Sequence, residues 1–184
     1  MSTRGALGFR LNGEDKITYN HSDSYPSWLG KRVVEWCRER TERQTWEGVK
    51  GIVAELEDVS GRTPTEEDKA RLTRFNNLRV GEQSEEDWYC LLRETQGNLS
   101  AILSARMFNG CREFLDDSLF CEWAYIINLD DMELEVYEGF QKKPHQEGRY
   151  GQGKMNDGYA PVRLVVTFPL EDIPEDWEKA CGEY

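Results

Sequence analysis

Residues 3–27, TRGALGFRLNGEDKITYNHSDSYPS, are the stretch around which the rest of the chain is organised. Apolar residues alternate with polar or small ones over residues 5–11 and again over residues 16–21. A period of two is typical of half-buried β-strands. The Asn12-Gly13 pair between the two runs is a turn signal, so the stretch predicts a β-hairpin.

The register of this hairpin decides which side chains share a face, because a slip of one residue moves every side chain to the other face. A two-residue turn would place Phe9 opposite Lys16 and mix apolar and charged side chains. We therefore predict a loop of three or five residues, which keeps the apolar residues of both strands together. The predicted buried face carries Leu7, Phe9, Leu11, Ile17 and Tyr19. The predicted solvated face carries Arg4, Arg10, Lys16, Thr18, Asn20 and Ser22.

In this register the buried face ends in three polar side chains at the open end of the hairpin: Thr3, His21 and Asp23. We interpret them as a candidate catalytic group. His21 would act as general base, Asp23 would orient it, and Thr3 would be the nucleophile or a ligand contact. Gly5 beside His21 leaves room for a ligand or for another backbone. The structural alternative is a satisfied half-buried histidine with Asp23 and Ser24 capping a helix.

A helix is predicted to start directly after the hairpin, because Ser24 or Ser27 can serve as N-cap and Pro26 suits a first turn. Helix N-termini attract anions through free N–H groups and the helix dipole. The predicted ligand is therefore a small molecule that is anionic or bears an amide, and whether it is bound or hydrolysed stays open. The predicted ligand-binding residues are Arg4, Asn20, Ser24, Tyr25, Arg149 and Lys154.

Two of these residues come from a second segment, 141–160, which reads QKKPHQEGRYGQGKMNDGYA. It contains four glycines and few apolar residues, and its Lys and Arg outnumber its acids by four to two. Long loops within compact domains are commonly lids, binding loops or mobile segments. We predict a mobile loop, or a lid that meets an anionic ligand. Its glycines do not form a Walker A sequence.

The order of the predicted elements gives the fold class. A hairpin over 1–26 is followed by a helical block over 27–108, with a break or bend within 41–48, and then by strands over 120–170. Strands and helices that segregate along the chain favour an α+β fold, here a single domain with a mostly antiparallel sheet. We expect the hairpin to join three C-terminal strands in one sheet covered by helices.

Finer signals fall within this order. Thr63-Pro64 predicts a helix start with Thr63 as the cap. Residues 122–128 are apolar on both faces, as in a central strand. In the strand after it, the three glutamates are expected to point outward: Glu133, Glu135 and Glu138.

Composition bounds the function further. The 184 residues carry a net charge of −12, which disfavours direct nucleic-acid binding through a basic face. The alternative function is an acidic interaction protein that mimics nucleic acid and acts on a basic host protein. Five irregularly spaced cysteines and only two histidines predict reduced thiols in the cytoplasm, no metal site and no cofactor. No apolar run approaches the ~20 residues of a membrane span, and the oligomeric state is left open.

The segments TRGALGFR, DKITYNHSDSYP and CEWAYIINLDDMELEVYEG resemble an uncharacterised family of bacterial and phage proteins. That resemblance implies no established activity. The N-terminal strand pair is also similar to that of N-terminal nucleophile hydrolases, in which a terminal Thr, Ser or Cys attacks an amide. The chain departs from that pattern because removal of Met1 would expose Ser2 rather than Thr3, and no lysine is obviously placed beside it.

Overall fold

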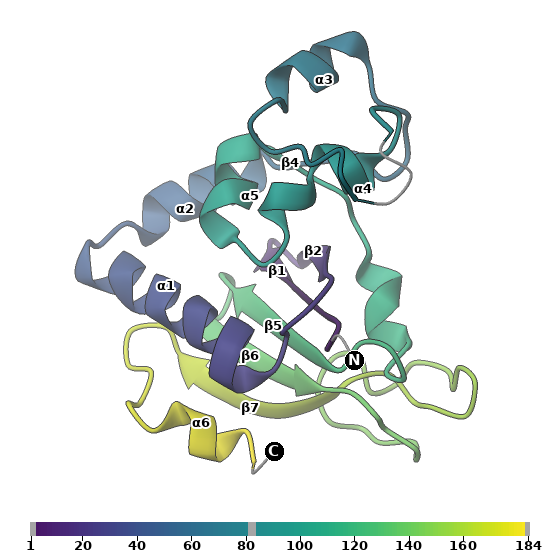
Figure 1. Ribbon diagram of the computed structural model, residues 1–184. Helices are drawn as coiled ribbons and strands as arrows, with labels where there is room; N and C mark the ends of the chain where they lie inside the picture. Colours follow the sequence, from purple (N-terminus) through teal and green to yellow (C-terminus); the bar gives the residue numbers. More distant parts are fainter. Residues whose placement is uncertain (1–2, 81–83, 183–184) are drawn as a thin grey trace.

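The computed structural model describes residues 3–80 and 84–182. Its main sheet has five strands in the order β2-β1-β5-β6-β7. The strands are β1 (Gly5–Leu11), β2 (Glu14–Asn20), β5 (Trp123–Asn128), β6 (Glu133–Glu138) and β7 (Arg163–Pro169). The N-terminal hairpin thus joins the three C-terminal strands, and the α+β prediction is confirmed (Figure 1).

The sheet is mostly antiparallel, since only the central pair β1 and β5 runs parallel within it. A parallel pair needs a long crossover connection, and the helical block between β2 and β5 supplies it. Strand β5 is buried along its whole length, as its two-sided apolar sequence predicts.

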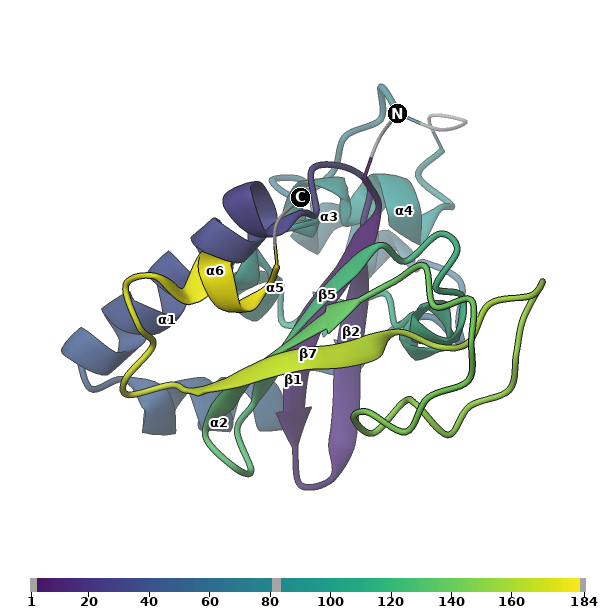
Figure 2. The same cartoon turned by 90° about the horizontal axis from the view of Figure 1, so that it is seen from below.

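The helical block begins with a five-residue π-helical turn, Pro26–Gly30, followed by α1 (Lys31–Glu42) and α2 (Trp46–Ala54). The bend predicted within 41–48 is therefore confirmed. The remaining elements are β3 (Glu57–Asp58), α3 (Glu66–Arg71), α4 (Trp88–Leu91), a 3-10 turn Arg93–Thr95, α5 (Leu99–Ala105), β4 (Met107–Phe108), a 3-10 turn Arg112–Asp116 and α6 (Trp177–Ala180). Helices α1, α2 and α5 lie on one face of the sheet (Figures 1 and 2).

The block is less helical than predicted, because β3 and β4 pair as a small parallel sheet and long connections flank α3. Helix α3 is capped by Thr65 rather than by Thr63. The Thr65 hydroxyl accepts from the Asp68 N–H, and the Asp68 carboxylate accepts from the Thr65 N–H. These two bonds form a capping box that starts two residues after the predicted cap.

The predicted register of the N-terminal hairpin is wrong. Asn12 and Gly13 form a two-residue turn with φ of +54° and +76°, and Phe9 lies opposite Lys16. Positive φ at both turn positions matches the twist of the flanking strands, which favours this turn over longer loops. Burial does not oppose it, because both faces of the hairpin are covered.

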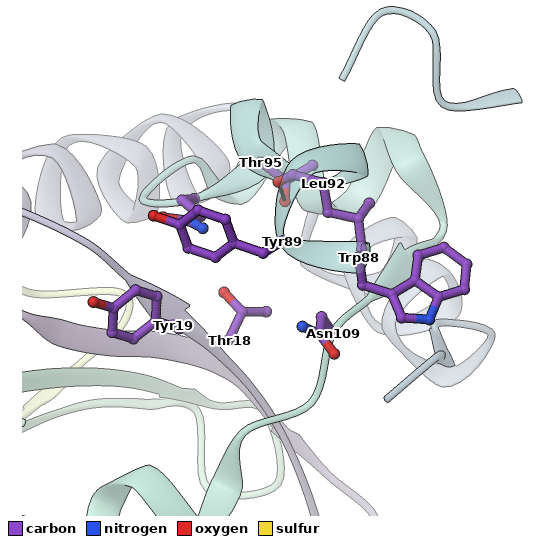
Figure 3. A pocket seen from close by; sticks show the side chains of 8 residues that line it. Thr18, Tyr19, Trp88, Tyr89, Leu92, Thr95 and Asn109 are labelled. Atoms are coloured by element: carbon purple, nitrogen blue, oxygen red, sulfur yellow. Dashed lines mark hydrogen bonds between the residues drawn. The ribbon is translucent and has the colours of Figure 1, made fainter. Parts of the chain in front are cut away.

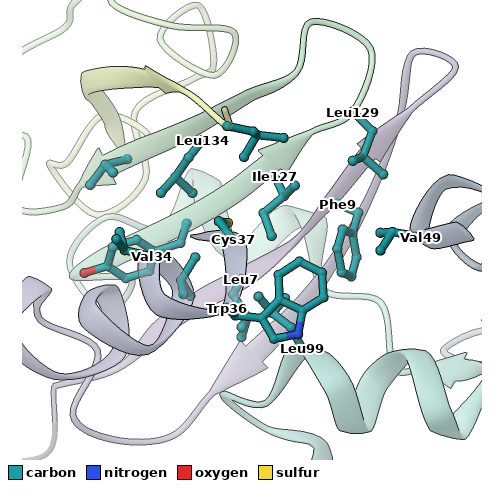
Figure 4. Packing of buried hydrophobic residues seen from close by; sticks show 14 of the residues in the cluster. Leu7, Phe9, Val34, Trp36, Cys37, Val49, Leu99, Ile127, Leu129 and Leu134 are labelled. Atoms are coloured by element: carbon teal, nitrogen blue, oxygen red, sulfur yellow. The ribbon is translucent and has the colours of Figure 1, made fainter. Parts of the chain in front are cut away.

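One face packs under the helices, where Leu7 and Phe9 meet Trp36 and Ile127 (Figure 4). The other face packs Ile17 in a second core. Three residues of β2 that we predicted to be solvated are also buried, on the face shared with Leu7 and Phe9: Lys16, Thr18 and Asn20.

Lys16 shows how a charge is accommodated inside. Its side chain is only 7% exposed, and its ammonium donates to the carbonyls of Val53 and Leu56 at 2.9 and 3.1 Å. These carbonyls lie at the C-terminal end of α2, where the helix dipole favours a cation. The contact between the ammonium and these carbonyls thus offsets the cost of burying the Lys16 charge in this register.

On the second face of the sheet, the prediction for Glu135 is also wrong. Glu135 does not point to solvent but is 4% exposed, where it accepts from Asn128 and Tyr137 at 2.8 and 2.9 Å. Its charge is balanced by Arg149 of segment 141–160. The same segment packs Tyr150 into the second core.

Asp130 connects the hairpin turn to the rest of the sheet. Its carboxylate accepts the N–H groups of Asn12 and Gly13 at 2.6 and 2.9 Å. These bonds, that from Gly13 foremost, lower the pKa of the Asp130 carboxyl below its ordinary value. A lowered pKa in the folded state stabilises the fold above the unfolded pKa, and that stability is lost as the pH falls through the folded pKa.

We therefore expect Asp130→Asn to cost about 1 kcal/mol at pH 7, with a smaller difference from the parent below about pH 4. Urea denaturation at both pH values measures this. Glu14, exposed in the same hairpin, provides the control as Glu14→Gln. Equal losses at both pH values would contradict a role for the ionised carboxylate.

Among the described residues no helix is long and apolar enough to cross a membrane.

Candidate functional site

A pocket opens between strand β2 and the segment that runs from α4 to the following 3-10 turn (Figure 3). Eight residues line it: Thr18, Tyr19, Trp88, Tyr89, Leu92, Thr95, Gln96 and Asn109. Its interior offers about 40 Å³ to the centres of water-sized molecules. Since one water needs roughly 10–15 Å³ of such space, the pocket accommodates a head group of a few heavy atoms.

Thr18 is the feature that sets this pocket apart. Its side chain is 6% exposed, and its hydroxyl oxygen is buried without a hydrogen-bond partner. The hydroxyl points towards Tyr89, with Tyr19 on one side and Asn109 on the other (Figure 3). A buried polar group without a partner costs about 1–3 kcal/mol, so its presence at a pocket wall indicates a group that a ligand satisfies.

The hairpin register is what places Thr18 there. Residues of β2 alternate between its two faces, so Thr18 points to the helical side together with Lys16 and Asn20. The buried Lys16 and Asn20 both have partners, α2 carbonyls for one and the Ser24 hydroxyl for the other. Of these three side chains, only Thr18 has an unpartnered side-chain atom.

An aromatic cluster forms the rim of the pocket. The rings of Tyr19 and Tyr89 lie 6.4 Å apart between centroids, and the Phe114 ring stands edge-on to Tyr19 at 5.2 Å. His21 belongs to this cluster, since its ring is 6.4 Å from that of Tyr89 and its Nδ1 is 3.3 Å from the Tyr19 hydroxyl. The histidine predicted from the sequence therefore touches two residues that line the pocket.

Two arginines stand close to this rim. Burial raises the pKa of the Tyr19 hydroxyl, and the positive charges of Arg4 and Arg93 oppose that shift. The Arg93 guanidinium lies over the Tyr89 ring at 5.6 Å from its centroid. Arg4, one of the predicted ligand-binding residues, is exposed and stacks on Phe120.

The three predicted catalytic residues have different partners. The Thr3 carbonyl accepts from the Ser24 N–H at 3.1 Å, and Asp23 is exposed and accepts from the Tyr25 hydroxyl at 3.2 Å. The hydrogen bond described for His21 runs to Tyr19. The register that predicted their convergence is wrong, and their catalytic roles stay predictions. Ser2, the alternative terminal nucleophile, lies outside the described residues.

Ser24 and Tyr25 hold the start of the helical block. Ser24 is fully buried, accepts from Asn20 at 2.8 Å and offers its carbonyl to the Tyr125 hydroxyl at 2.9 Å. It does not cap the following turn, whose N-cap position is Tyr25. A Cβ on Gly5 would lie 2.3 Å from the Trp123 carbonyl oxygen and 2.6 Å from the Ser24 Cβ. The space beside Gly5 is thus filled by protein.

The two residues predicted from segment 141–160 differ in their surroundings. Arg149 forms ion pairs with Glu135 and with Asp15, so its charge is already balanced inside the protein. Lys154 is exposed. Tyr150 anchors the segment by donating to Asp15 at 2.9 Å.

Sequence reasoning missed Thr18, Tyr89, Gln96 and Asn109 as pocket residues. One signal was available for Thr18: the two-residue turn at Asn12-Gly13 places it opposite Leu7, on the face under the helices. Tyr89 and Gln96 come from the segment around α4, and Asn109 comes from the exit of the helical block. No local pattern indicates that this segment lies against Thr18.

Within residues 3–80 and 84–182, no group of three or more His, Cys, Asp or Glu side chains is arranged to hold a metal ion. No family model, curated protein or solved structure matches the chain.

Proposed function

We propose that the protein binds a small polar head group in the pocket between β2 and α4. The observation that carries this proposal is the unpartnered, buried hydroxyl of Thr18 at the pocket wall. Aromatic and aliphatic walls from Trp88, Tyr89 and Leu92 would exclude water from the ligand, and the amides of Gln96 and Asn109 supply further hydrogen-bonding groups. A few placed polar groups within a largely apolar lining are typical of small-molecule sites.

Binding is better supported than hydrolysis. A nucleophile and its base need to lie within hydrogen-bond reach of one another. The side-chain hydrogen bonds described for His21 and Asp23 go to Tyr19 and Tyr25. His21 is therefore assigned here to the rim of a binding site, where it holds the Tyr19 hydroxyl.

The alternative of an acidic interaction protein is less favoured. Several of the carboxylates that contribute to the charge of −12 form ion pairs or hydrogen bonds within the protein. Asp68 and Glu135 are buried against Arg62 and Arg149, and Asp130 binds the hairpin turn. These acids stabilise the fold rather than forming a surface that copies phosphates.

The two buried threonines of the pocket provide a matched test. Thr95 is as buried as Thr18, but its hydroxyl donates to the Leu92 carbonyl at 2.7 Å. We expect Thr95→Val to lose about 1 kcal/mol, because a hydrogen bond disappears. We expect Thr18→Val to be as stable as the parent or about 1 kcal/mol more stable, because an unsatisfied hydroxyl is removed from the interior.

Thermal and urea denaturation of both variants measure this difference, and each kcal/mol corresponds to roughly 2–4 °C in Tm for a chain of this size. In parallel, amide chemical shifts of labelled protein would be followed on addition of phenylacetate and phenylacetamide, two small head-group probes. Shifts at Thr18, Tyr19 and Gln96 that disappear in Thr18→Val support the proposal. A Thr18→Val variant that is as destabilised as Thr95→Val, with no probe bound by the parent, contradicts it.

A further inference from the structure

We infer that the head group taken by this pocket is a carboxylate, held by hydrogen-bond donors of Thr18 and Gln96 and by the charge of Arg93. The inference rests on the proposed binding function and names its ligand class. It follows from which atoms around the pocket are donors, and from where the charges lie.

Gln96 presents a donor. Its Oε1 accepts from the Arg93 guanidinium at 2.8 Å. Since a guanidinium has no acceptor atom, the amide oxygen must be the atom facing Arg93. The two N–H groups of the Gln96 amide are then directed away from Arg93 and call for acceptors.

Thr18 and Arg93 add further donors. The Thr18 hydroxyl carries one proton and has no partner, and the buried Arg93 Nε–H also lacks one. Arg93 lies just behind the lining, where it contacts the side chains of Gln96 and Tyr89. The Thr18 hydroxyl and the Gln96 amide both belong to residues that line the pocket, and a carboxylate, with its two acceptor oxygens, can accept from both.

The charges around the pocket favour an anion. None of the eight lining side chains is a carboxylate, although the chain as a whole carries a net charge of −12. Arg4 and Arg93 both act on Tyr19 at the pocket rim. An anion in a pocket without lining carboxylates and beside the Arg93 guanidinium is stabilised, whereas an ammonium group would be repelled.

The volume sets the size of the group. About 40 Å³ for water-sized centres admits the carboxylate but leaves any ring or chain attached to it at the mouth. The carboxylate could belong to a free organic acid or to the C-terminus of a peptide, and both would present the same two oxygens.

The test compares phenylacetate with its neutral isostere phenylacetamide at constant ionic strength, by titration of labelled amides in the folded protein. We expect phenylacetate to bind roughly tenfold more tightly, since hydrogen bonds to a charged group are the stronger ones. A peptide ending in phenylalanine and its C-terminal amide form a second pair. Tighter binding of the free peptide acid than of phenylacetate would identify a peptide C-terminus as the source, and the reverse order would identify a small acid.

Arg93→Gln is the decisive variant, with Arg74→Gln as its control. Arg74 also stacks on an aromatic ring, that of Phe75. Its guanidinium, however, donates to Ser104, which does not line the pocket. We expect Arg93→Gln to weaken phenylacetate at least fivefold and leave phenylacetamide within twofold, while Arg74→Gln changes neither. Equal affinity for phenylacetate and phenylacetamide overturns the carboxylate assignment but leaves the pocket function standing. Failure of every probe to shift the pocket amides overturns both.

Discussion

Replacing Gly8 by alanine is expected to remove most of the stability of the protein. Gly8 lies in the middle of β1, paired with Ile17 of β2 and with Ile126 of β5. A Cβ at this position would lie 2.0 Å from the Lys16 carbonyl oxygen and 2.9 Å from the Ile17 Cα. Both are backbone atoms of the neighbouring strand, so no side chain can turn away to make room.

We expect a loss of at least about 4 kcal/mol, above the roughly 1–3 kcal/mol that is usual for overpacking, because the backbone of β2 cannot move aside without breaking its pairing with β1. That is a large part of the 5–15 kcal/mol that stabilises an ordinary domain. Urea denaturation of Gly8→Ala, or its failure to remain soluble, reports the effect. A variant within about 1 kcal/mol of the parent would mean that β1 and β2 do not pair in this register.

Gly48→Ala is the matched control. Gly48 lies on the exposed side of α2, and a Cβ there would meet nothing within 4 Å. Alanine has a higher helix propensity than glycine by about 1 kcal/mol, so this variant is expected to be more stable than the parent. The same chemical change thus has opposite effects at the two sites, because one faces a strand backbone and the other faces solvent.

The second large effect is expected at Arg149. Its guanidinium is the charge partner of Glu135, whose carboxylate is buried on the second face of the sheet. Removing one partner of a buried ion pair leaves an uncompensated charge and costs about 3–5 kcal/mol. We therefore expect Arg149→Met to lose about 3 kcal/mol, measured by urea denaturation at pH 7.

The double variant Arg149→Met with Glu135→Gln is expected to recover much of that loss, because it removes the unpaired charge. The amide oxygen of glutamine can accept from Asn128, and its N–H can donate to the Tyr137 hydroxyl oxygen. Arg163→Met is the control, since its pair with Glu138 is solvent-exposed and such pairs are worth about 0–1 kcal/mol. No recovery in the double variant would show that Arg149 acts through packing on Tyr150 rather than through charge.

The parts of the fold that depend on local pattern were predictable. The structure confirms the strand in residues 5–11, the two-sided burial of residues 122–128 and the bend within 41–48. The one-sided burial predicted from the alternation in residues 5–11 is wrong, because both faces of that strand are covered. The joining of the hairpin to the C-terminal strands was also predictable, because segregated strands and helices leave few ways to bury one sheet.

The Asn12-Gly13 turn signal also indicated the register of the hairpin. Whether that register is stable, however, depends on a distant partner for Lys16. Lys16 looks out of place on a buried face until the C-terminal carbonyls of α2 are brought to it. The same holds for Glu135, whose outward prediction reversed once Arg149 was packed beside it. Short-range patterns rank a charged residue as exposed, and only a counter-charge or dipole from another segment changes that ranking.

By itself the sequence determined the α+β class and the order of the strands around the helical block. Only the tertiary structure decided that a pocket is built on Thr18, since the segment from Tyr89 to Gln96 and the residue Asn109 lie far from Thr18 in the chain. The physical reason is that periodicity reports which face of an element is buried, whereas an unmet hydrogen bond exists only once every neighbour has taken its place.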